Sequence, residues 1–409
     1  MPVVPELLAP AGDLEKLRFA YAYGADAAYI GGGDFSLRSN AGCGLDVLAE
    51  ACSLARRTGK KLYVAVNIYA DNHDIAVLPS YLENLAELQP DGLLISDPGV
   101  FRLAQQYAPR LPIHISTQAN NTNWLSARFW AEQGASRIVL ARELSIAEGA
   151  EIAQRSGLEA EIFVHGAICI SYSGRCLISQ FLTGRSANRG DCSHPCRWQY
   201  VLEEEKRPGE YFPVEEDARG SYFFNSRDLC LLAAIPQLVA GGFSAWKIEG
   251  RNKSAYYVAN VVRVYRAALD AYLRDPDGWR CRSAWLEELT RVSHRGYTTG
   301  FALGLPDADA YRYDDGSYLR SYDFTAVALE MRDGLLWLEQ RNHFAVGDVL
   351  ELLLPDATNI VLPVKAIYDE NGCLLDAARH PRMQVAVDCG SLPVMLPFPL
   401  ICRRAVRES

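Results

Sequence analysis

The 409-residue chain lacks any apolar run approaching the roughly 20 residues of a membrane-spanning helix. Its first residues, Met-Pro-Val-Val-Pro-Glu, lack the basic and apolar regions of a signal peptide. Basic residues are not in excess either: 41 Lys and Arg stand against 50 Asp and Glu, a net charge of -9. This charge argues against a protein that coats nucleic acid by bulk attraction, although a local basic patch can still act. We therefore expect a cytoplasmic protein with no membrane partner.

Cysteine is plentiful by contrast, with 11 residues. In the reducing cytoplasm these are core residues, ligands or nucleophiles rather than disulfides. Six are scattered along the chain, while the other five lie between positions 169 and 230. The five clustered cysteines therefore need a chemical explanation.

The first part of the chain repeats one unit, a short apolar run followed by a turn and a helical pattern of period 3.6. The expected strands are Glu6–Ala9, Ala27–Ile30, Lys61–Ile68, Gly92–Ser96, Ile113–Thr117, Arg137–Ala141, Glu159–Val164 and, after a long irregular stretch, Ala245–Ile248. Expected helices include Leu14–Tyr23, Leu45–Thr58, Val100–Tyr107, Trp124–Gln133 and Ser254–Asp270. Such alternation predicts a parallel sheet. Eight units over about 270 residues favour a closed (β/α)8, TIM-like barrel. An open doubly wound sheet is the rival, but no Gly-x-Gly-x-x-Gly turn supports it.

In such a barrel the residues that follow the strands meet at one rim, where active sites form. That rim would collect polar groups and turn glycines, namely Pro10, Gly12, Tyr29, Gly31, Asn67, Asp97, Gln118, Arg142, Glu143, His165, Glu249 and Arg251.

The pattern changes after residue 275. We expect three regions: a barrel domain over 1–275 with a cysteine-rich insertion at 165–230, a helical segment and linker over 276–322, and a small all-β barrel or sandwich over 323–409. Expected strands of the last region include Ala326–Met331, Leu335–Glu339, Val349–Leu353, Ile360–Ala366, Gln384–Val387 and Leu396–Ile401. The β-rich region carries no catalytic constellation, so we expect it to bind or dock a partner.

Four cysteines form the pattern Cys-x6-Cys-x15-Cys-x3-Cys within loop-forming sequence: Cys169, Cys176, Cys192 and Cys196. Four thiolates suit an iron–sulfur cluster or a tetrahedral zinc ion. Zinc sites usually have a short Cys-x2-4-Cys pair at each end, and only the last pair has that spacing, which favours a cluster. Cys230, at the start of an apolar pattern, is the alternative fourth ligand or a buried core residue. His194 could also ligate a metal.

Basic residues surround this pattern, among them Arg175 and Arg197, and Lys247 and Arg251 follow later. Either they form a solvated loop, or their charges hold an anionic substrate or phosphate backbone, for which the planar guanidinium is suited. Trp198 could stack on a base or simply pack.

Several motifs together resemble the collagenase-like "U" peptidase family over most of the chain. They are Glu6-Leu-Leu-Ala-Pro-Ala-Gly12, Gly24-Ala-Asp-Ala-Ala-Tyr-Ile30, Phe163-Val-His-Gly166, Tyr172-Ser-Gly-Arg-Cys176 and Lys247-Ile-Glu-Gly-Arg251. Two further segments, Arg207–Tyr211 and His294–Gly300, resemble the members of that family that hydroxylate tRNA.

The resemblance implies an oxygen-independent hydroxylase with a 4Fe–4S cluster on Cys169, Cys176, Cys192 and Cys196. It implies conversion of the tRNA wobble uridine to 5-hydroxyuridine, with prephenate, a small dicarboxylate, as hydroxyl source. The anticodon loop would be the macromolecular partner, because its bases are already splayed.

On this hypothesis, Arg142, Arg175, Arg197 and Lys247 bind carboxylate or phosphate. Glu249, His165 and Arg251 are the catalytic candidates, the first two for proton handling or for orienting a neighbouring group.

Three alternatives remain at this point: a peptidase, a hydroxylase of ribosomal RNA or of a small aromatic molecule, and a non-enzymatic binder with structural zinc. The chain has no His-Glu-x-x-His helix and no Gly-x-Ser-x-Gly elbow. Ser193 and His194 are adjacent, which seldom gives the geometry of a nucleophile and its base. Proteolysis is therefore the less favoured alternative. A partner protein cannot be identified from the sequence.

Overall fold

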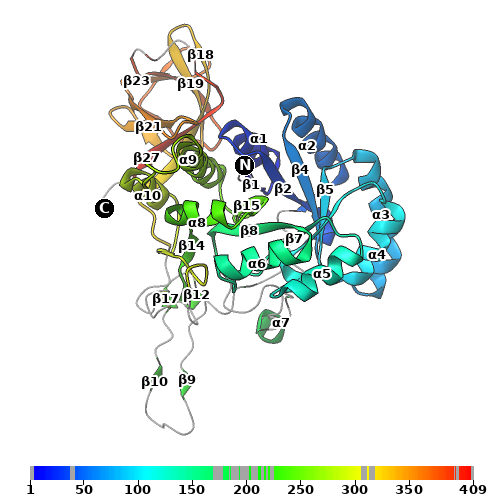
Figure 1. Ribbon diagram of the computed structural model, residues 1–409. Coiled ribbons are helices and arrows are strands. Elements are labelled where there is room, and N and C mark those ends of the chain that lie inside the picture. Colours follow the sequence, from blue (N-terminus) through cyan, green and yellow to red (C-terminus); the bar gives the residue numbers. More distant parts are fainter. Residues whose placement is uncertain are drawn as a thin grey trace.

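The computed structural model describes residues 4–36, 42–168, 178–183, 185, 193, 202–203, 211–212, 216–217, 220–221, 225–304, 311–312, 318–390, 392 and 396–406. Eight parallel strands form a closed barrel with helices around it (Figure 1). The strands are β1 (Glu6–Ala11), β2 (Ala27–Gly32), β4 (Lys61–Val66), β5 (Gly92–Ile95), β6 (Ile113–Ile115), β7 (Arg137–Val139), β8 (Glu159–Gly166) and β15 (Ala245–Ile248). Because β15 pairs with both β8 and β1, the sheet closes. The (β/α)8 prediction is confirmed, and the open sheet is excluded.

The helices follow the strands as the period predicts. They are α1 (Leu14–Ala22), α2 (Leu45–Thr58), α3 (Asn72–Leu88), α4 (Pro98–Tyr107), α5 (Trp124–Glu132), α6 (Ile146–Ser156), α8 (Ile235–Ala240) and α9 (Ala255–Arg274). At the amino ends of six of these helices, a side-chain oxygen of the capping residue accepts a hydrogen bond from a backbone N–H group of the first turn. The capping residues are Asp13, Asp71, Asp97, Asn123, Ser145 and Ser254. These caps satisfy donors that the first turn of a helix leaves unpaired.

Between β8 and β15 the described residues include the helix α7 (Ile178–Thr183) and several short strands. The short strands are β9 (Leu202–Glu203), β10 (Tyr211–Phe212), β11 (Glu216–Asp217), β12 (Gly220–Ser221), β13 (Asn225–Ser226) and β14 (Asp228–Cys230). Strand β14 pairs antiparallel with the end of β8 and parallel with β16 (Tyr297–Thr298), so it extends the sheet beside the barrel. Strands β3 (Gly42–Cys43), beside β2, and β17 (Tyr311–Arg312), beside β13, complete this part.

The carboxyl-terminal region is an antiparallel sheet in the order β22-β21-β27-β18-β19-β26-β23-β24. Its strands are β18 (Tyr322–Arg332), β19 (Leu335–Gln340), β21 (Val349–Leu353), β22 (Asn359–Pro363), β23 (Ala366–Tyr368), β24 (Leu374–Leu375), β26 (Gln384–Asp388) and β27 (Leu400–Ala405), while β20 (Phe344–Ala345) pairs with β25 (Ala377–Ala378). The two-residue turn between β18 and β19 has positive φ at Asp333 (54°) and Gly334 (77°), as a type I′ hairpin turn requires.

Two strand predictions in this region had wrong boundaries. The expected strand over Ile360–Ala366 is divided between β22 and β23, because Pro363 has no N–H to continue the ladder. The expected strand over Leu396–Ile401 begins at Leu400 instead, since Pro397 and Pro399 also lack that donor.

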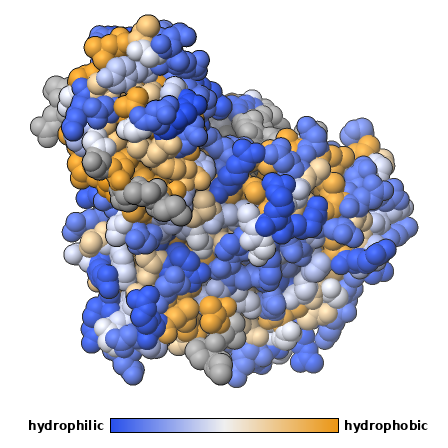
Figure 2. Space-filling view, turned by 90° about the horizontal axis from the view of Figure 1, so that it is seen from above, coloured by the Kyte–Doolittle hydropathy of each residue, from blue (hydrophilic) through white to orange (hydrophobic). Residues whose placement is uncertain are grey.

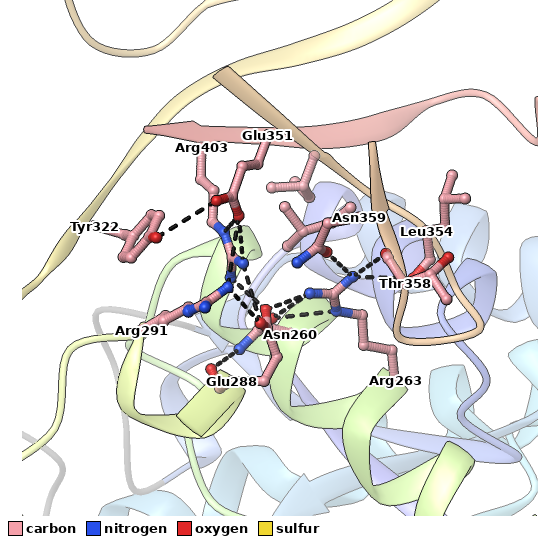
Figure 3. A network of polar contacts seen from close by, with 12 residues as sticks. Asn260, Arg263, Glu288, Arg291, Tyr322, Glu351, Leu354, Thr358, Asn359 and Arg403 are labelled. Carbon is pink, nitrogen blue, oxygen red and sulfur yellow. Dashed lines mark hydrogen bonds and ion pairs between the residues drawn. The ribbon is translucent and has the colours of Figure 1, made fainter. Parts of the chain in front are cut away.

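A buried polar network joins the two parts of the chain (Figure 3). Glu288, on α10 (Ser283–Thr290), forms ion pairs with Arg263 of α9 and Arg403 of β27. Arg263 also donates to the carbonyl oxygens of Leu354 and Thr358, at 3.1 and 3.0 Å. Because both guanidinium groups are fully buried and fully paired, this network fixes the sheet against the barrel.

The hydrophobic core runs continuously from the barrel into the carboxyl-terminal sheet. Tyr23, at the end of α1, is buried and donates to the Leu353 carbonyl at 2.8 Å, while Ile401 N–H donates to its hydroxyl at 2.9 Å. From above, hydrophilic residues cover most of the visible face, with smaller hydrophobic patches among them (Figure 2).

Candidate active site at the carboxyl end of the barrel

The carboxyl ends of the barrel strands bring several predicted rim residues together. Asn67, after β4, donates through Nδ2 to Gln118 Oε1 at 3.1 Å and to Ser116 Oγ at 3.3 Å, both after β6. The Tyr69 hydroxyl donates to the Gln118 carbonyl at 2.6 Å. Side chains that follow β4 and β6, which β5 separates in the sheet, therefore form one hydrogen-bonded group at the rim.

Glu249 and Arg142 meet at this rim although 107 residues separate them. Arg142 Nη2 lies 3.4 Å from Glu249 Oε2, and the Tyr29 hydroxyl lies 3.3 Å from the same oxygen. The Arg142 guanidinium stacks over the Phe163 ring, 3.9 Å from its centroid. Arg142 is therefore held between a carboxylate and an aromatic ring, and its planar guanidinium is the type of group that binds carboxylates.

Arg251 lies close by but is held by the protein. Its Nη1 donates to Ser36 Oγ at 2.7 Å, and its backbone oxygen accepts from Lys16 Nζ at 3.3 Å. A Cβ at Gly12 would lie 2.2 Å from that backbone oxygen, so only glycine permits this close approach of the first and last strand ends. The guanidinium also lies 5.6 Å from the centroid of the Tyr29 ring.

Lys247 lies beneath the rim, inside the barrel. Its Nζ is 2.7 Å from Glu161 Oε1 and 4.3 Å from the centroid of the Tyr29 ring. Burial lowers the pKa of Lys247 by more than Glu161 raises it. Arg137 continues the network toward the other end of the barrel, with Nη1 2.9 Å from Glu6 Oε2 and 3.5 Å from Glu161 Oε2.

Sequence reasoning missed this interior network of Glu6, Arg137 and Glu161. A usable signal was present, because Glu161 shares the two-residue period of β8 with Phe163 and His165 and so faces the barrel interior. A charged residue at an inward position needs a partner of opposite charge.

Glu143 is partly exposed beside Arg142. Burial raises its pKa by more than Arg142 lowers it, so its carboxyl group is a weaker acid than usual. A raised carboxyl pKa at a barrel rim is suited to proton transfer.

His165, the last inward-facing residue of β8, is enclosed by aromatic rings. The ring centroids of Tyr297, Tyr265 and Tyr257 lie 5.2, 5.5 and 6.1 Å from that of His165. Burial lowers the pKa of His165 to about 3, so the imidazole stays neutral. Within the described part of the chain, its Nε2 atom has no hydrogen-bond partner. This imidazole can therefore bind or orient a group as a neutral ring, but it is poorly placed to act as a cation.

The four predicted ligands, Cys169, Cys176, Cys192 and Cys196, lie outside the described residues, as do Arg175, Arg197, His194 and Trp198. We call residues 169–196 the cysteine-bearing segment. Strand pairing of β14 with β8 brings the two ends of the 165–230 insertion together, with Cys230 opposite His165 and Leu229 opposite Gly166. Four thiolates are the donor set that an iron–sulfur cluster takes, so the composition of the segment fits that group. Within the described ranges, no three His, Cys, Asp or Glu side chains are grouped to hold a metal ion.

Cys230, the alternative fourth ligand, is described. Burial raises the pKa of its thiol to about 11, and the Tyr265 hydroxyl lies 3.9 Å from its sulfur. In this setting the thiol is neutral and hydrogen-bonded to the barrel, which is the environment of a core cysteine.

A buried ion pair lies beside these residues. Arg295 contacts Asp228 Oδ1 through Nη2 at 2.7 Å and through Nε at 3.0 Å. Burial raises the pKa of Asp228, but Arg295 and Lys253 lower it by more, so the carboxylate stays charged. The segment 294–300, noted above only for its resemblance, therefore packs against β14.

The peptidase alternative gains no support from the described residues. The Ser193 hydroxyl lies 2.9 Å from Ser179 Oγ and 3.0 Å from Thr183 Oγ1, so its neighbours are hydroxyl groups rather than a base. A serine nucleophile needs a base within hydrogen-bond reach.

A closed (β/α)8 barrel with charged and aromatic groups at its carboxyl end defines the class of barrel enzymes whose active site forms at that rim. The chain belongs to peptidase family U32: the model of that family matches residues 12–312, and the model of its C-terminal domain matches residues 320–399.

Three named relatives extend this result. The tRNA hydroxylation protein P1 of Bacillus subtilis is 41% identical over 92% of this chain and 90% of its own length. The tRNA hydroxylation protein P of Escherichia coli is 38% identical over 86% of each chain. The 23S rRNA 5-hydroxycytidine C2501 synthase of Escherichia coli is 35% identical over 77% of this chain and 47% of its own. No helix among the described residues is long and apolar enough to cross a membrane.

Proposed function

We propose that this protein is a tRNA-modifying hydroxylase of the cytoplasm that forms 5-hydroxyuridine at the wobble position without molecular oxygen. The observation that carries the proposal is the similarity, over nearly the whole chain, to proteins named for tRNA hydroxylation. The ribosomal RNA relative points to the same chemistry on another RNA, so ribosomal RNA is the second candidate substrate.

The proposed reaction exchanges a hydroxyl group of a donor for the hydrogen on C5 of uridine. The base is oxidised by two electrons and the donor is reduced by two, so no further oxidant is needed. We propose prephenate as this donor. Its two carboxylates suit the cationic rim, where Arg142 stacks on the Phe163 ring and Arg251 lies 5.6 Å from the centroid of the Tyr29 ring.

A 4Fe–4S cluster on Cys169, Cys176, Cys192 and Cys196 would supply one-electron chemistry beside the rim. The residues of the chain then have distinct tasks. Arg142 binds a donor carboxylate, Glu249 orients Arg142 and Tyr29, and Glu143 exchanges a proton. Lys247 supports the floor of the site through Glu161 rather than contacting RNA, because it is buried and paired.

Mass spectrometry of nucleosides tests the substrate. A strain that lacks the gene should lose 5-hydroxyuridine from tRNA, and the wild-type gene should restore it. The Cys176→Ala variant should not restore it, while Cys373→Ala, at an exposed cysteine far along the chain, should. Loss of a hydroxylated base from ribosomal RNA alone would replace tRNA by the second candidate.

Metal analysis tests the cofactor independently of activity. Protein purified without oxygen should be coloured and contain iron and acid-labile sulfide in equal amounts. A colourless protein with one zinc ion per chain would defeat the cluster and favour a structural site. Hydrolysis of gelatin by cluster-free protein would instead revive the peptidase alternative.

A further inference from the structure

Arg227 stands between two elements of the site, directly after β13 and directly before Asp228 of β14. Its side chain is partly exposed, but the Nε atom is buried. In the described part of the chain, no carboxylate or carbonyl oxygen pairs with this guanidinium. A partly buried cation without a partner is unfavourable unless a ligand supplies the missing charge.

The nearby carboxylate already has an ion-pair partner. Asp228 forms its buried ion pair with Arg295, and Lys253 adds a second positive charge that acts on the same carboxylate. Arg227 directly precedes this carboxylate in the sequence, and Arg295 and Lys253 both act on it. These cationic side chains lie beside the pairing of β14 with β8.

The side chain of Arg227 packs against Gly296. A Cβ at this glycine would be 3.4 Å from Arg227 Cδ and 3.6 Å from Arg227 Nε, so the side chain runs across the glycine. Gly296 has a φ of +79°, which disfavours any side chain there. The side chain is thus packed along its stem, while its Nε atom has no partner among the residues that the structure describes.

Resting on the proposed function, we propose that Arg227 binds a phosphate of the RNA backbone next to the modified base. Arg142 and Arg251 lie within the rim, where a small carboxylate fits, whereas Arg227 lies outside the barrel strands and remains partly exposed. Phosphate contacts of this kind fix the register of a nucleic acid without reading its sequence.

The test is the salt dependence of tRNA binding by the full chain. Neutralising one phosphate contributes about 0.7–0.9 to the slope of log K against log salt concentration. Arg227→Ala should reduce the steepness by about that amount and weaken binding at low salt, whereas Arg227→Lys should keep the slope because it keeps the charge. Arg110→Ala removes an exposed arginine from the loop between α4 and β6, at the opposite end of the barrel, and should leave the slope unchanged.

The outcomes separate this inference from the proposed function. If the wild-type protein binds tRNA and Arg227→Ala has the wild-type slope, the phosphate contact is wrong while the proposed function stands. If the slope is unchanged and KM for the carboxylate donor rises, Arg227 binds the donor instead, which also overturns the inference. Failure of the wild-type protein to bind or modify any tRNA would contradict both the phosphate contact and the proposed function. Thermal unfolding of each variant checks that the fold is retained.

Discussion

Arg295 and Asp228 form a buried ion pair, with Nη2 and Nε of the arginine 2.7 and 3.0 Å from one carboxylate oxygen. Arg295 follows α10, whereas Asp228 begins β14, whose next residues pair with His165 and Gly166. This one contact therefore connects the segment after α10 to β14, at the end of the 165–230 insertion.

Replacing Arg295 by alanine should destabilise the protein strongly, because Asp228 would keep its charge in a buried place. Loss of one partner of such a pair costs about 3–5 kcal/mol. Urea denaturation measures this change. The control is Arg320→Ala, which breaks the exposed ion pair with Asp323 and should cost about 1 kcal/mol or less. Equal losses of stability in the two variants would show that the buried ion pair stabilises the protein no more than the exposed one.

Replacing Arg403 by alanine should loosen the carboxyl-terminal sheet from the barrel. Glu288 and Glu351 would each lose a buried partner, again at a cost of about 3–5 kcal/mol. Calorimetry should then resolve a separate transition for the sheet, whereas we expect the wild-type chain, with its continuous core, to unfold in a single transition. A single transition at the wild-type temperature would contradict a coupling role, and Arg332→Ala, in a surface pair with Glu330, controls for loss of charge.

As the pH is lowered from about 6.5 to 4.5, the free energy of unfolding should decrease because of His114, which is buried inside the barrel. Burial, Arg137 and Lys247 hold its pKa well below the usual 6.5. Below pH 6.5 the unfolded chain takes up a proton that the folded chain does not, so unfolding becomes easier by up to about 1.4 kcal/mol per pH unit for this one group.

His114→Gln should flatten this part of the curve of unfolding free energy against pH. The carboxylates with lowered pKa, Glu6 and Glu288, act only near and below their ordinary range around 4.5. His165, whose pKa burial also lowers, contributes equally to the wild type and the variant, so the difference between their slopes reports His114. The exposed His380→Gln serves as the matched control and should leave the slope as in the wild type. An unchanged slope in His114→Gln would contradict the assignment.

Arg142→Ala should raise KM for the carboxylate donor more than it lowers kcat, if Arg142 binds the donor equally in the ground and transition states. Loss of one charge-assisted hydrogen bond, about 1.5–3 kcal/mol, corresponds to an increase of roughly 10- to 150-fold. Steady-state kinetics of tRNA hydroxylation at varied donor concentration measures it. A fall in kcat at constant KM would assign Arg142 to the chemical step instead.

Local sequence determined most of the fold. The alternation of apolar runs with capped helical patterns predicted eight strands whose cores agree with those observed, because a parallel strand and an amphipathic helix each have their own periodicity. The long antiparallel strands were also recognisable, but proline shifted two boundaries, since a missing N–H changes which residues can pair. The sequence also placed Arg142, Glu249 and Arg251 at a common rim.

Tertiary structure alone decided which charges meet. Glu161 meets Lys247 and Arg137 only because the barrel closes, and Arg263 meets Glu288 only because the sheet packs on α9. Asp228 likewise meets Arg295, 67 residues away in sequence, only in the folded chain. Sequence patterns indicate which face of an element is buried, whereas the pairing of buried charges depends on distances between elements that only the folded chain sets. The cysteine spacing thus came from the sequence, and the tertiary structure brought the two ends of the 165–230 insertion together through β8 and β14.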